Sequence, residues 1–430
     1  TPRIVLAGGT LVSATGARRL ANGLKVEAAA ASTLVDVHIE GDKIMAVMPP
    51  AAHHDKQHTV VKCHNLFIIA GLCDAHVHVT ACSGDLRSLA TVPPSLLALR
   101  AGVALKEMLH RGFTTVRDCG GADMGIAEAI QEGTIEGPRL LYCGKALSQT
   151  GGHGDFRLKG EWRLPCPCTA DTTIGRVCDG ADAVRSAARD ELRKGASHIK
   201  IMASGGVSSP TDRICNLQFA EDELKAAVDT ASAAGVGVSA HAYTAEAITR
   251  AVRAGVRSIE HGNLADDAAL ELMAERGAFL VPTIITYEEI RRRGVESGMP
   301  KELVAKVADL VERGVETLGK AEALGVPIAY GSDLLGEMRD AQLAGLALHA
   351  RVQSNAGILA ALTSSAASLF QQEASVGIVA PGAHADLLVL NRNPIAEGVA
   401  EVLSNPDSIK LILKAGKPVL NRGLQGFEAA

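Results

Sequence analysis

The sequence predicts an α/β protein: a (β/α)₈ barrel accompanied by a small β-sandwich domain that both chain termini build together. Three observations predict it. Eight short, apolar, β-branched runs occur between residues 66 and 333, and longer helical patterns separate them. Polar residues gather where these runs end. The two ends of the chain instead show short alternating runs split by Gly and Pro, a pattern typical of antiparallel hairpins.

The eight predicted strands favour a barrel over an open sheet. They cover residues 66–79 and the runs that begin at Gly112, Arg139, Ser197, Gly235, Gly255, Gly277 and Gly325. Helical patterns such as 94–112 and 181–195 end in glycine, a common helix C-cap. A doubly wound sheet is the alternative. Eight successive units with polar residues after the strands favour the barrel, because its strand ends converge on one face.

The two ends of the chain predict the second domain. Residues 1–70 and 374–430 contain VDVHIEGDKIMAVMP and GAHADLLVLNRNP, which read as short strands between turns. We expect these segments to form one composite β-sandwich, and residues 71–373 to form the barrel. We interpret the three histidines of HHDKQH, at residues 53–58, as solvent-exposed in preference to a metal site.

Composition excludes several classes of partner. The 430 residues are 47% hydrophobic and 21% charged, as in globular proteins. Only 7 Phe, 4 Tyr and 1 Trp are present and the net charge is −5, which disfavours nucleic acid and acidic membrane surfaces. No run approaches the roughly 18 apolar residues of a membrane helix. The opening TPRIVLAGGTLVS lacks the pattern of a secretory signal, so we expect a cytoplasmic protein.

The nine cysteines are interpreted as reduced thiols, which agrees with a cytoplasmic location. Their number is odd, and they lie mostly in apolar surroundings. The CPC sequence at Cys166 and Cys168 has no second pair at zinc-ribbon spacing, so a thiol-rich loop is favoured over a metal site.

A group of polar residues at predicted strand ends indicates a metal site. His76 and His78 in DAHVH are two apart on a strand, so both imidazoles face the same side and can reach one cation. Further polar residues end the predicted strands four, five, six and eight: Lys200, His241, His261 and Asp333. Each alone could be structural, but together they would meet at the barrel mouth. A lysine ammonium has no lone pair, so Lys200 could ligate only after carboxylation by carbon dioxide.

This motif set resembles the metal-dependent amidohydrolase superfamily over nearly the whole chain. The resemblance includes GLCDAHVH, the strand-four lysine, the two later histidines, GSD and the closing GAHADLLVLNRNP. It implies two divalent metal ions, with His76 and His78 on the first, His241 and His261 on the second, and carboxylated Lys200 bridging them. Asp333 would ligate the first metal and act as the catalytic base. Zinc is expected because it suits imidazole and carboxylate ligands, and manganese and cobalt are alternatives.

Further strings resemble the ochratoxinase and Xaa-Pro dipeptidase branch of the superfamily. They are ALSQTGGHGD, IKIMASGGVSSP, AHAYTAEAI and RSIEHGN. Members of this branch remove a C-terminal amino acid from a dipeptide or an N-acyl amino acid. The resemblance implies that His153 and Tyr243 help to hold the substrate. It therefore predicts hydrolysis of the amide bond in small carboxylate-terminated compounds, such as Xaa-Pro dipeptides or ochratoxin A, by a homo-oligomer.

The group that would bind the substrate carboxylate stays open. Arg117 is a candidate, although a structural pair with Asp118 is equally compatible with the sequence. The run Arg291–Arg293 is interpreted as a solvated helix face. Residues 156–175 are expected to form a lid or rim over the mouth.

Two other functions remain as alternatives. One is a cyclic amidase of the imidazolonepropionase or hydantoinase type, and the other is a non-catalytic barrel scaffold. A scaffold would not need all six metal-site side chains. Nucleotide binding is disfavoured, because GVETLGKA at 314–321 ends in alanine and lies inside a helical pattern.

Overall fold

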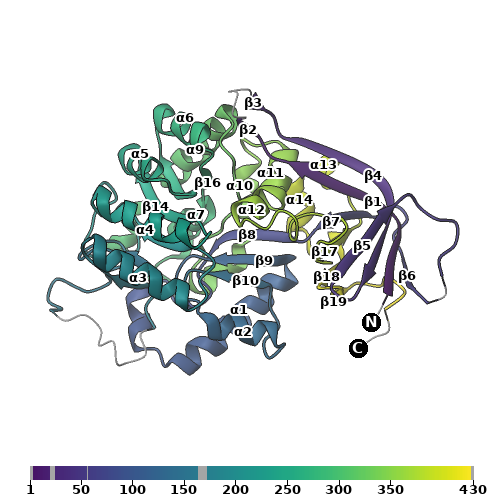
Figure 1. The fold of residues 1–430 in the computed structure, drawn as a ribbon, viewed down its shortest axis with the longest axis horizontal. Helices are drawn as coiled ribbons and strands as arrows, with labels where there is room; N and C mark the ends of the chain where they lie inside the picture. Colours follow the sequence, from purple (N-terminus) through teal and green to yellow (C-terminus); the bar gives the residue numbers. More distant parts are fainter. Residues whose placement is uncertain (1–2, 20–24, 56, 163–171, 428–430) are drawn as a thin grey trace.

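Strands from both ends of the chain pair in one eight-stranded sheet, here called the terminal sheet (Figure 1). The computed structural model describes residues 3–19, 25–55, 57–162 and 172–427. The strands of the terminal sheet are β1 (Arg3–Thr15), β4 (Ala29–Glu40), β5 (Lys43–Met48), β6 (Thr59–Lys62), β7 (Phe67–Ala70), β17 (Leu387–Leu390), β18 (Ile409–Lys414) and β19 (Lys417–Asn421). Most neighbours are antiparallel, whereas β6 and β7 run parallel to β1. A separate antiparallel sheet from the two termini is therefore confirmed.

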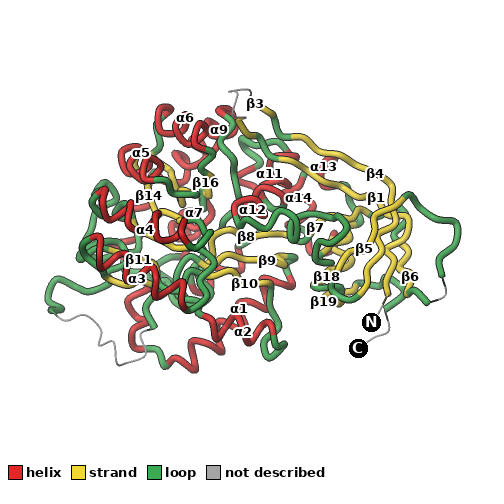
Figure 2. Tube along the Cα trace, viewed as in Figure 1, coloured by secondary structure: helices red, strands yellow, loops and turns green. Residues whose placement is uncertain are grey.

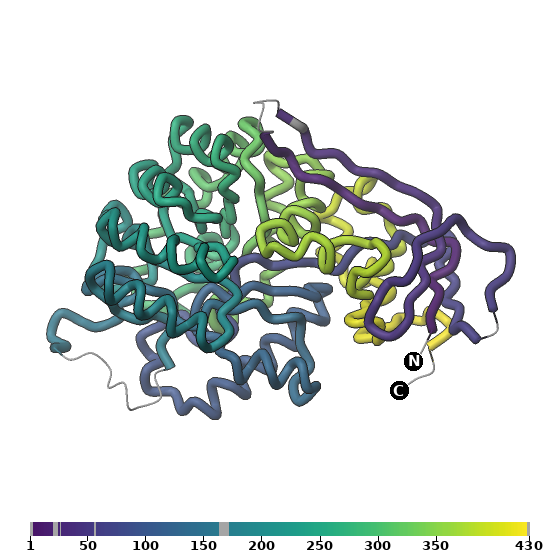
Figure 3. Tube along the Cα trace, in the orientation of Figure 1, coloured from purple at the N-terminus to yellow at the C-terminus, as the bar shows by residue number. Residues whose placement is uncertain are grey.

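The terminal sheet forms because its strands are rich in apolar residues, and β7 and β17 are apolar along their whole length. Val37 and Ile39 of β4, Ile68 of β7 and Leu411 of β18 are buried in one apolar cluster. Figure 3 shows strands from the beginning and the end of the chain side by side, as the pairing of β7 with β17 requires. A short pair, β2 (Arg18–Arg19) and β3 (Lys25–Val26), lies outside this sheet.

The chain passes from the terminal sheet into the parallel sheets at Gly71. The predicted strand 66–79 is divided there into β7 and β8 (Leu72–Val77). The Gly71 N–H donates to the Asp386 carbonyl at 2.8 Å, and a Cβ at this position would collide with the Thr114 side chain. Glycine therefore permits the close approach that joins the two sheets.

The middle of the chain forms parallel strands in two sheets. One has the order β10-β9-β8 and the other β12-β11-β13-β14-β15-β16. The strands that follow β8 are β9 (Phe113–Asp118), β10 (Arg139–Tyr142), β11 (Ala146–Ser148), β12 (Gly175–Val177), β13 (Ile199–Met202), β14 (Val238–Thr244), β15 (Ser258–Leu264) and β16 (Phe279–Val281). Their apolar residues are almost completely buried, as expected for parallel strands covered by helices.

Two further predicted strands differ from the structure. The run from Arg139 is divided into β10 and β11, which belong to different sheets. The run from Gly325 forms only an isolated parallel bridge, Leu280↔Ile328, because Pro327 has no N–H to donate to a ladder. It still lies between β16 and β8, since Ala329 N donates to Leu280 O at 3.0 Å and Ala75 N donates to Tyr330 O at 2.7 Å.

Helices flank the parallel strands (Figure 2). The α-helices are α1 (Pro94–His110), α2 (Met124–Gln131), α3 (Ala181–Arg193), α4 (Glu221–Ala233), α5 (Ala245–Ala254), α6 (Asp267–Arg276), α7 (Ile284–Arg293), α8 (Lys301–Val304), α9 (Leu310–Leu324), α10 (Gly345–His349), α11 (Asn355–Ala361), α12 (Ser364–Leu369), α13 (Pro394–Glu397) and α14 (Val399–Ser404). The short 3₁₀ helices are η1 (Leu86–Thr91), η2 (Ala305–Val307), η3 (Gly336–Ala341) and η4 (Pro406–Ser408). Helices α5, α6 and α9 end at left-handed glycines. The glycines predicted at the ends of the patterns 94–112 and 181–195 also have positive φ, but they follow Arg111 and Lys194, the C-cap residues of α1 and α3.

Two other expectations concern the described part of the chain. None of its helices has the length and apolar character that crossing a bilayer would require. Its cysteines, Cys63, Cys73, Cys82, Cys119, Cys143, Cys178 and Cys215, are all free thiols. Cys166 and Cys168, the CPC sequence, lie outside the described residues.

Candidate active site

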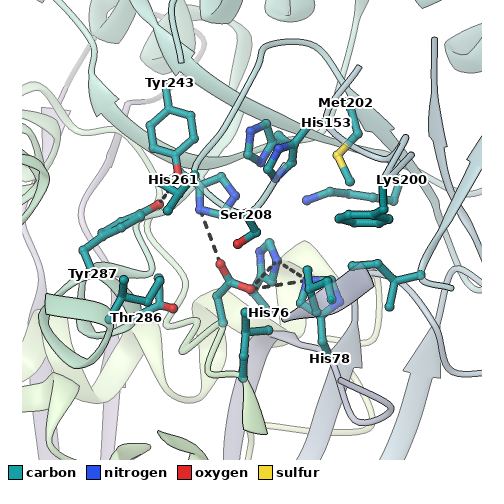
Figure 4. Close-up of a pocket in the computed structure, with 18 residues that line it drawn as sticks. His76, His78, His153, Lys200, Met202, Ser208, Tyr243, His261, Thr286 and Tyr287 are labelled. Carbon is teal, nitrogen blue, oxygen red and sulfur yellow. Dashed lines mark hydrogen bonds and ion pairs between the residues drawn. The ribbon is translucent and has the colours of Figure 1, made fainter. Parts of the chain in front are cut away.

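All eight residues singled out in the sequence line one pocket at the carboxyl ends of the parallel strands (Figure 4). They are His76, His78, His153, Lys200, His241, Tyr243, His261 and Asp333. Strand β8 carries His76, β13 carries Lys200, β14 carries His241 and β15 carries His261. The fold thus brings together side chains that are far apart in the sequence, because parallel strands end at a common edge.

His76, His78 and Asp333 form the tightest part of this pocket. The Nε2 atoms of the two imidazoles are 3.3 Å apart. Asp333 Oδ1 lies 3.5 Å from His76 Nε2 and 3.3 Å from His78 Nε2. The Asp333 N–H also donates to the His76 carbonyl at 2.8 Å, which ties the two backbones together.

The Nδ1 atom of each imidazole makes a hydrogen bond on the side away from Asp333. His76 Nδ1 donates to Glu260 Oε2 at 2.8 Å, and His78 Nδ1 donates to the Gly120 carbonyl at 2.9 Å. Since these acceptors take the proton on Nδ1, the neutral form of each imidazole presents the lone pair of Nε2 to the pocket. Two lone pairs beside a carboxylate oxygen repel each other, so a cation between them would stabilise the arrangement.

His241 and His261 also line the pocket, with ring centroids 4.5 Å apart. His241 Nε2 donates to the Gly205 carbonyl at 3.1 Å, which leaves Nδ1 with a lone pair. His261 Nδ1 lies 2.7 Å from Thr283 Oγ1 and 3.9 Å from Asp333 Oδ2. His261 and Asp333 have positive φ angles of 76° and 53°, an unfavourable backbone conformation that concentrates at functional sites.

Lys200 is buried among these imidazoles without a hydrogen-bond partner. Its side chain is 1% exposed, and Nζ contacts no acceptor in the part of the chain that the structure describes. Burial of an unpaired ammonium is costly. Carboxylation of Nζ would replace this cation with an anionic ligand, so the position fits a carbamate better than a free lysine.

Burial and neighbouring charges shift the pKa values of the pocket residues in different directions. Burial, reinforced by the Lys200 cation, lowers the pKa of His76 well below its usual value. Burial alone would raise the pKa of Asp333. His76 and His78 lower this pKa by a larger amount, so it lies below its ordinary value. Burial lowers the pKa of His78, but the hydrogen bond and the charge of Asp333 raise it by more, so the net pKa lies above the ordinary value. A divalent metal binds an ionised carboxylate and neutral imidazoles, so its binding would release any proton that His78 holds.

These residues fit a metal ion. His76, His261 and Asp333 each offer a ligand atom, and these atoms lie within 4.8 Å of one another. Imidazole nitrogen and carboxylate oxygen are ligands that zinc accepts, and related divalent metals share this preference.

His153 and Tyr243 lie beside the histidine cluster. The ring of His153 stacks on His241 at a centroid distance of 4.0 Å, and His153 Nδ1 is 2.7 Å from Ser209 Oγ. Burial lowers the pKa of His153 to about 4, so the ring is neutral at pH 7. Tyr243 stacks on His261 at 5.1 Å, and its hydroxyl lies 2.8 Å from the Tyr287 hydroxyl.

Sequence reasoning missed Glu260 and the role of Arg117. Arg117 donates from Nη2 to Glu260 Oε1 at 2.7 Å and from Nε to the Ala75 carbonyl at 2.7 Å. Arg117 does not line the pocket, which argues against it as the group that binds the substrate carboxylate. Its ion-pair partner is Glu260 and not Asp118. Glu260 could have been found from the sequence, because it is an acidic residue within an apolar predicted strand. A buried acid needs a charged or hydrogen-bonding partner.

Tyr287 was also missed, because it lies within α7 and not at a strand end. The arginines that follow it on α7 pair with acidic residues. Arg291 bonds Glu288, and Arg293 bonds Glu289 and Asp340, which supports their interpretation as a helix face.

The predicted lid contributes its ends to the pocket. Phe156 and Ile174 line it, whereas residues 163–171 lie outside the described part of the chain.

The carboxyl ends of the parallel strands bring histidines, a buried lysine and an aspartate into one pocket. Together with the similarity to known proteins, this arrangement identifies a hydrolytic enzyme. The protein belongs to the amidohydrolase family, whose sequence model matches residues 67–419. The family membership and the hydrolytic activity expected from the motifs are thus confirmed.

Three relatives define the branch. Ochratoxinase of Aspergillus niger is 33% identical over 395 residues, which cover 87% of this chain and 81% of that protein. A prolidase crystallised with N-methylphosphonate-L-proline superposes with a TM-score of 0.89 at 44% identity, covering 97% of this chain and all 100% of the other. A Xaa-Pro dipeptidase with bound methionine gives a TM-score of 0.80 at 26% identity over 95% of this chain and 99% of that one. These relatives confirm the ochratoxinase and dipeptidase-like branch.

The Arg117–Glu260 pair leads to a stability prediction. In Glu260→Gln, the 5%-exposed Arg117 side chain loses its buried counter-ion. We expect a loss of about 3–5 kcal/mol in the free energy of unfolding, the usual effect of leaving one buried charge unpaired. Chemical denaturation measures it. Glu312→Gln is the control, because its exposed pair with Arg351 is screened by solvent and should contribute little. Equal stability of the two variants would contradict the prediction.

Proposed function

We propose that the protein hydrolyses the amide bond of small substrates that end in a free carboxylate, and that it releases the C-terminal amino acid. Xaa-Pro dipeptides and N-acyl amino acids such as ochratoxin A are the substrate classes we expect. The observation that carries the proposal is the Asp333 carboxylate held 3.3–3.5 Å from two imidazoles in a pocket that also contains Lys200, His241 and His261. Similarity to an ochratoxinase and to a prolidase crystallised with a proline derivative supports this choice of substrate.

The pocket residues would hold two divalent metal ions, with zinc as the expected metal. In this assignment His76, His78 and Asp333 would hold the first ion, His241 and His261 would hold the second, and N-carboxylated Lys200 would serve as a ligand shared by both. Bound metals of this kind lower the pKa of water and polarise a carbonyl group. Glu260, Gly120 and Gly205 accept from one ring nitrogen each of His76, His78 and His241, so the neutral form of each ring offers its other nitrogen as a ligand atom.

Asp333 is assigned the proton transfers. Its carboxylate accepts a proton from the attacking water and delivers it to the nitrogen of the leaving amino acid, which needs that proton to depart as an amine. The contacts of Oδ1 with His76 and His78 fix the orientation of the carboxylate, and its lowered pKa keeps it ionised before the reaction.

Substrate binding is assigned to neutral donors and an apolar wall. In the described pocket lining Lys200 is the only side chain of the lysine or arginine type. Burial raises the pKa values of Tyr243 and Tyr287, so both phenols stay protonated and can donate to substrate oxygens. His153 faces the same space, while Phe156, Ile174 and Ile290 offer apolar contacts for a substrate side chain.

We also propose that the parallel strands close into an eight-stranded barrel and that the terminal sheet folds as a sandwich domain. Residues 71–373 would form the first and residues 1–70 with 374–430 the second. The hydrogen bonds from residues 327–333 to both β16 and β8 support closure on one side, and the bond from Ser197 N to Tyr142 O at 2.8 Å supports it on the other. A cytoplasmic homo-oligomer with a small-molecule substrate remains our expectation.

A matched substrate panel tests the proposed activity. Zinc-loaded protein is assayed for amine release from Xaa-Pro and Xaa-Phe dipeptides, ochratoxin A and their C-terminally amidated forms. We expect cleavage of the free-carboxylate compounds alone. Hydantoins and lactams are included with ring opening monitored, since ring opening without amino-acid release would instead identify a cyclic amidase. A panel without any turnover would contradict the proposal.

Asp333→Asn separates proton transfer from metal binding. The amide keeps the size of the side chain and can coordinate weakly, but it cannot carry the proton, so we expect kcat to fall by about 10²–10⁴-fold with most of the metal retained. Steady-state kinetics and metal analysis of the same sample measure the two effects. Asp229→Asn on the surface of α4 is the control. Near-normal kcat in Asp333→Asn would remove Asp333 from the mechanism.

Lys200→Ala tests the bridging carbamate. The metal content of the purified protein should fall, because the variant loses a proposed shared ligand. Short carboxylic acids such as acetate should partly restore metal and activity by occupying the space of the carbamate. Lys225→Ala, on the exposed face of α4, should do neither. Full metal content and activity in Lys200→Ala would eliminate the carbamate.

A further inference from the structure

A second histidine cluster lies on the terminal sheet and has no part in the proposed function. Asp36 and His38 are two apart on β4 and share a face of the strand. Together with His54, from the loop between β5 and β6, they offer ligand atoms that all lie within 4.8 Å of one another. His54 Nε2 is 3.5 Å from Asp36 Oδ2.

The loop folds its histidines back onto β4. The ring centroid of His38 is 6.2 Å from that of His54 and 5.9 Å from that of His58. His53 is exposed, as expected from the sequence, but the His54 side chain is only 13% exposed and His58 is half-buried. His54 and His58 are therefore less exposed than the sequence interpretation expected, because they pack against His38.

Two of the ring nitrogens in this cluster are buried without a partner. His38 Nε2 and His58 Nδ1 make no hydrogen bond within the described part of the chain. Burial of a polar atom without a partner costs free energy, and native proteins seldom leave such atoms unsatisfied. A ligand that accepts nitrogen lone pairs would satisfy both.

The Asp36 carboxylate gives the histidine cluster a negative charge that could attract a cation. It is 1% exposed and accepts the backbone N–H groups of Gly8 at 2.7 Å and Ala51 at 2.8 Å. Among the described residues, His54 is the only basic side chain paired with it. Each carboxylate oxygen retains a second lone pair, so a fixed and weakly neutralised anion remains available to a cation.

We propose that Asp36, His38, His54 and His58 form a structural binding site for a borderline divalent cation, with zinc as the expected ion. Three imidazoles and one carboxylate make a four-ligand donor set that suits zinc. Asp36, His38 and His54 are already close together, and His58 completes the set by a small movement of the loop. The ion would fasten the β5–β6 loop to β4, and through Gly8 to β1.

The test compares zinc binding by His54→Ala and His53→Ala in the full-length, zinc-loaded protein. His53 is the matched control, because it precedes His54 in the same loop and is exposed. After dialysis against buffered zinc, we expect His54→Ala to hold one zinc per chain fewer than the wild type, with amide hydrolysis unchanged. His53→Ala should match the wild type in both respects.

His38→Gln and His58→Ala extend the test. Both should lose the same equivalent of zinc, and Lys200→Ala should retain it, which separates this site from the active site. Zinc should also protect the β5–β6 loop from proteolysis in the wild type but not in His54→Ala. Equal zinc content in the wild type, His54→Ala and His38→Gln would overturn the proposal and leave a histidine cluster that binds no metal.

Discussion

The buried contact between Glu260 and His76 is the interaction on which the geometry of the candidate active site depends. Glu260 bonds the Nδ1 side of the imidazole, and Arg117 holds the other carboxylate oxygen. Arg117 is in turn bonded to the Ala75 carbonyl, directly before His76 in the chain. The ring, its supporting acid and its own backbone thus form one closed network. Because each member is buried, the orientation of the imidazole is set by the fold and does not need a ligand to select it.

This network connects strands that contribute different parts of the pocket. Glu260 lies on β15 next to His261, Arg117 lies on β9, and His76 lies on β8. A displacement of any of these strands would alter the distance between the two sides of the histidine cluster. Catalytic constellations tolerate little misplacement, so a rigid support of this kind has a direct effect on rate.

The positions of His76, His78, Lys200, His241, His261 and Asp333 could be predicted from the sequence because their spacing follows simple geometry, whereas His153 and Tyr243 were predicted from the family resemblance alone. His76 and His78 share a face of a strand, and the later polar residues end apolar runs. Glu260 escaped notice because the same strand carries the more conspicuous His261. Tyr287 lies on a helix, where position along a strand gives no information. The segment at 327–330 was predicted as a strand from its apolar run, but Pro327 cannot donate to a ladder. The folding back of His54 and His58 depends on tertiary contacts with β4, which no local pattern encodes.

The terminal sheet combines strands from the two ends of the chain, and this has a consequence for folding during synthesis on the ribosome. Strand β7 has β1 on one side, which is made before it, and β17 on the other, which is made only after all the parallel strands. Until the last strands emerge, the backbone N–H and C=O groups on one edge of β7 lack their partner strand, although β8, its direct continuation, already has its own partner β9 within reach. Completion of this sheet is therefore a late, long-range event, of the type that slows folding and exposes a chain to chaperones.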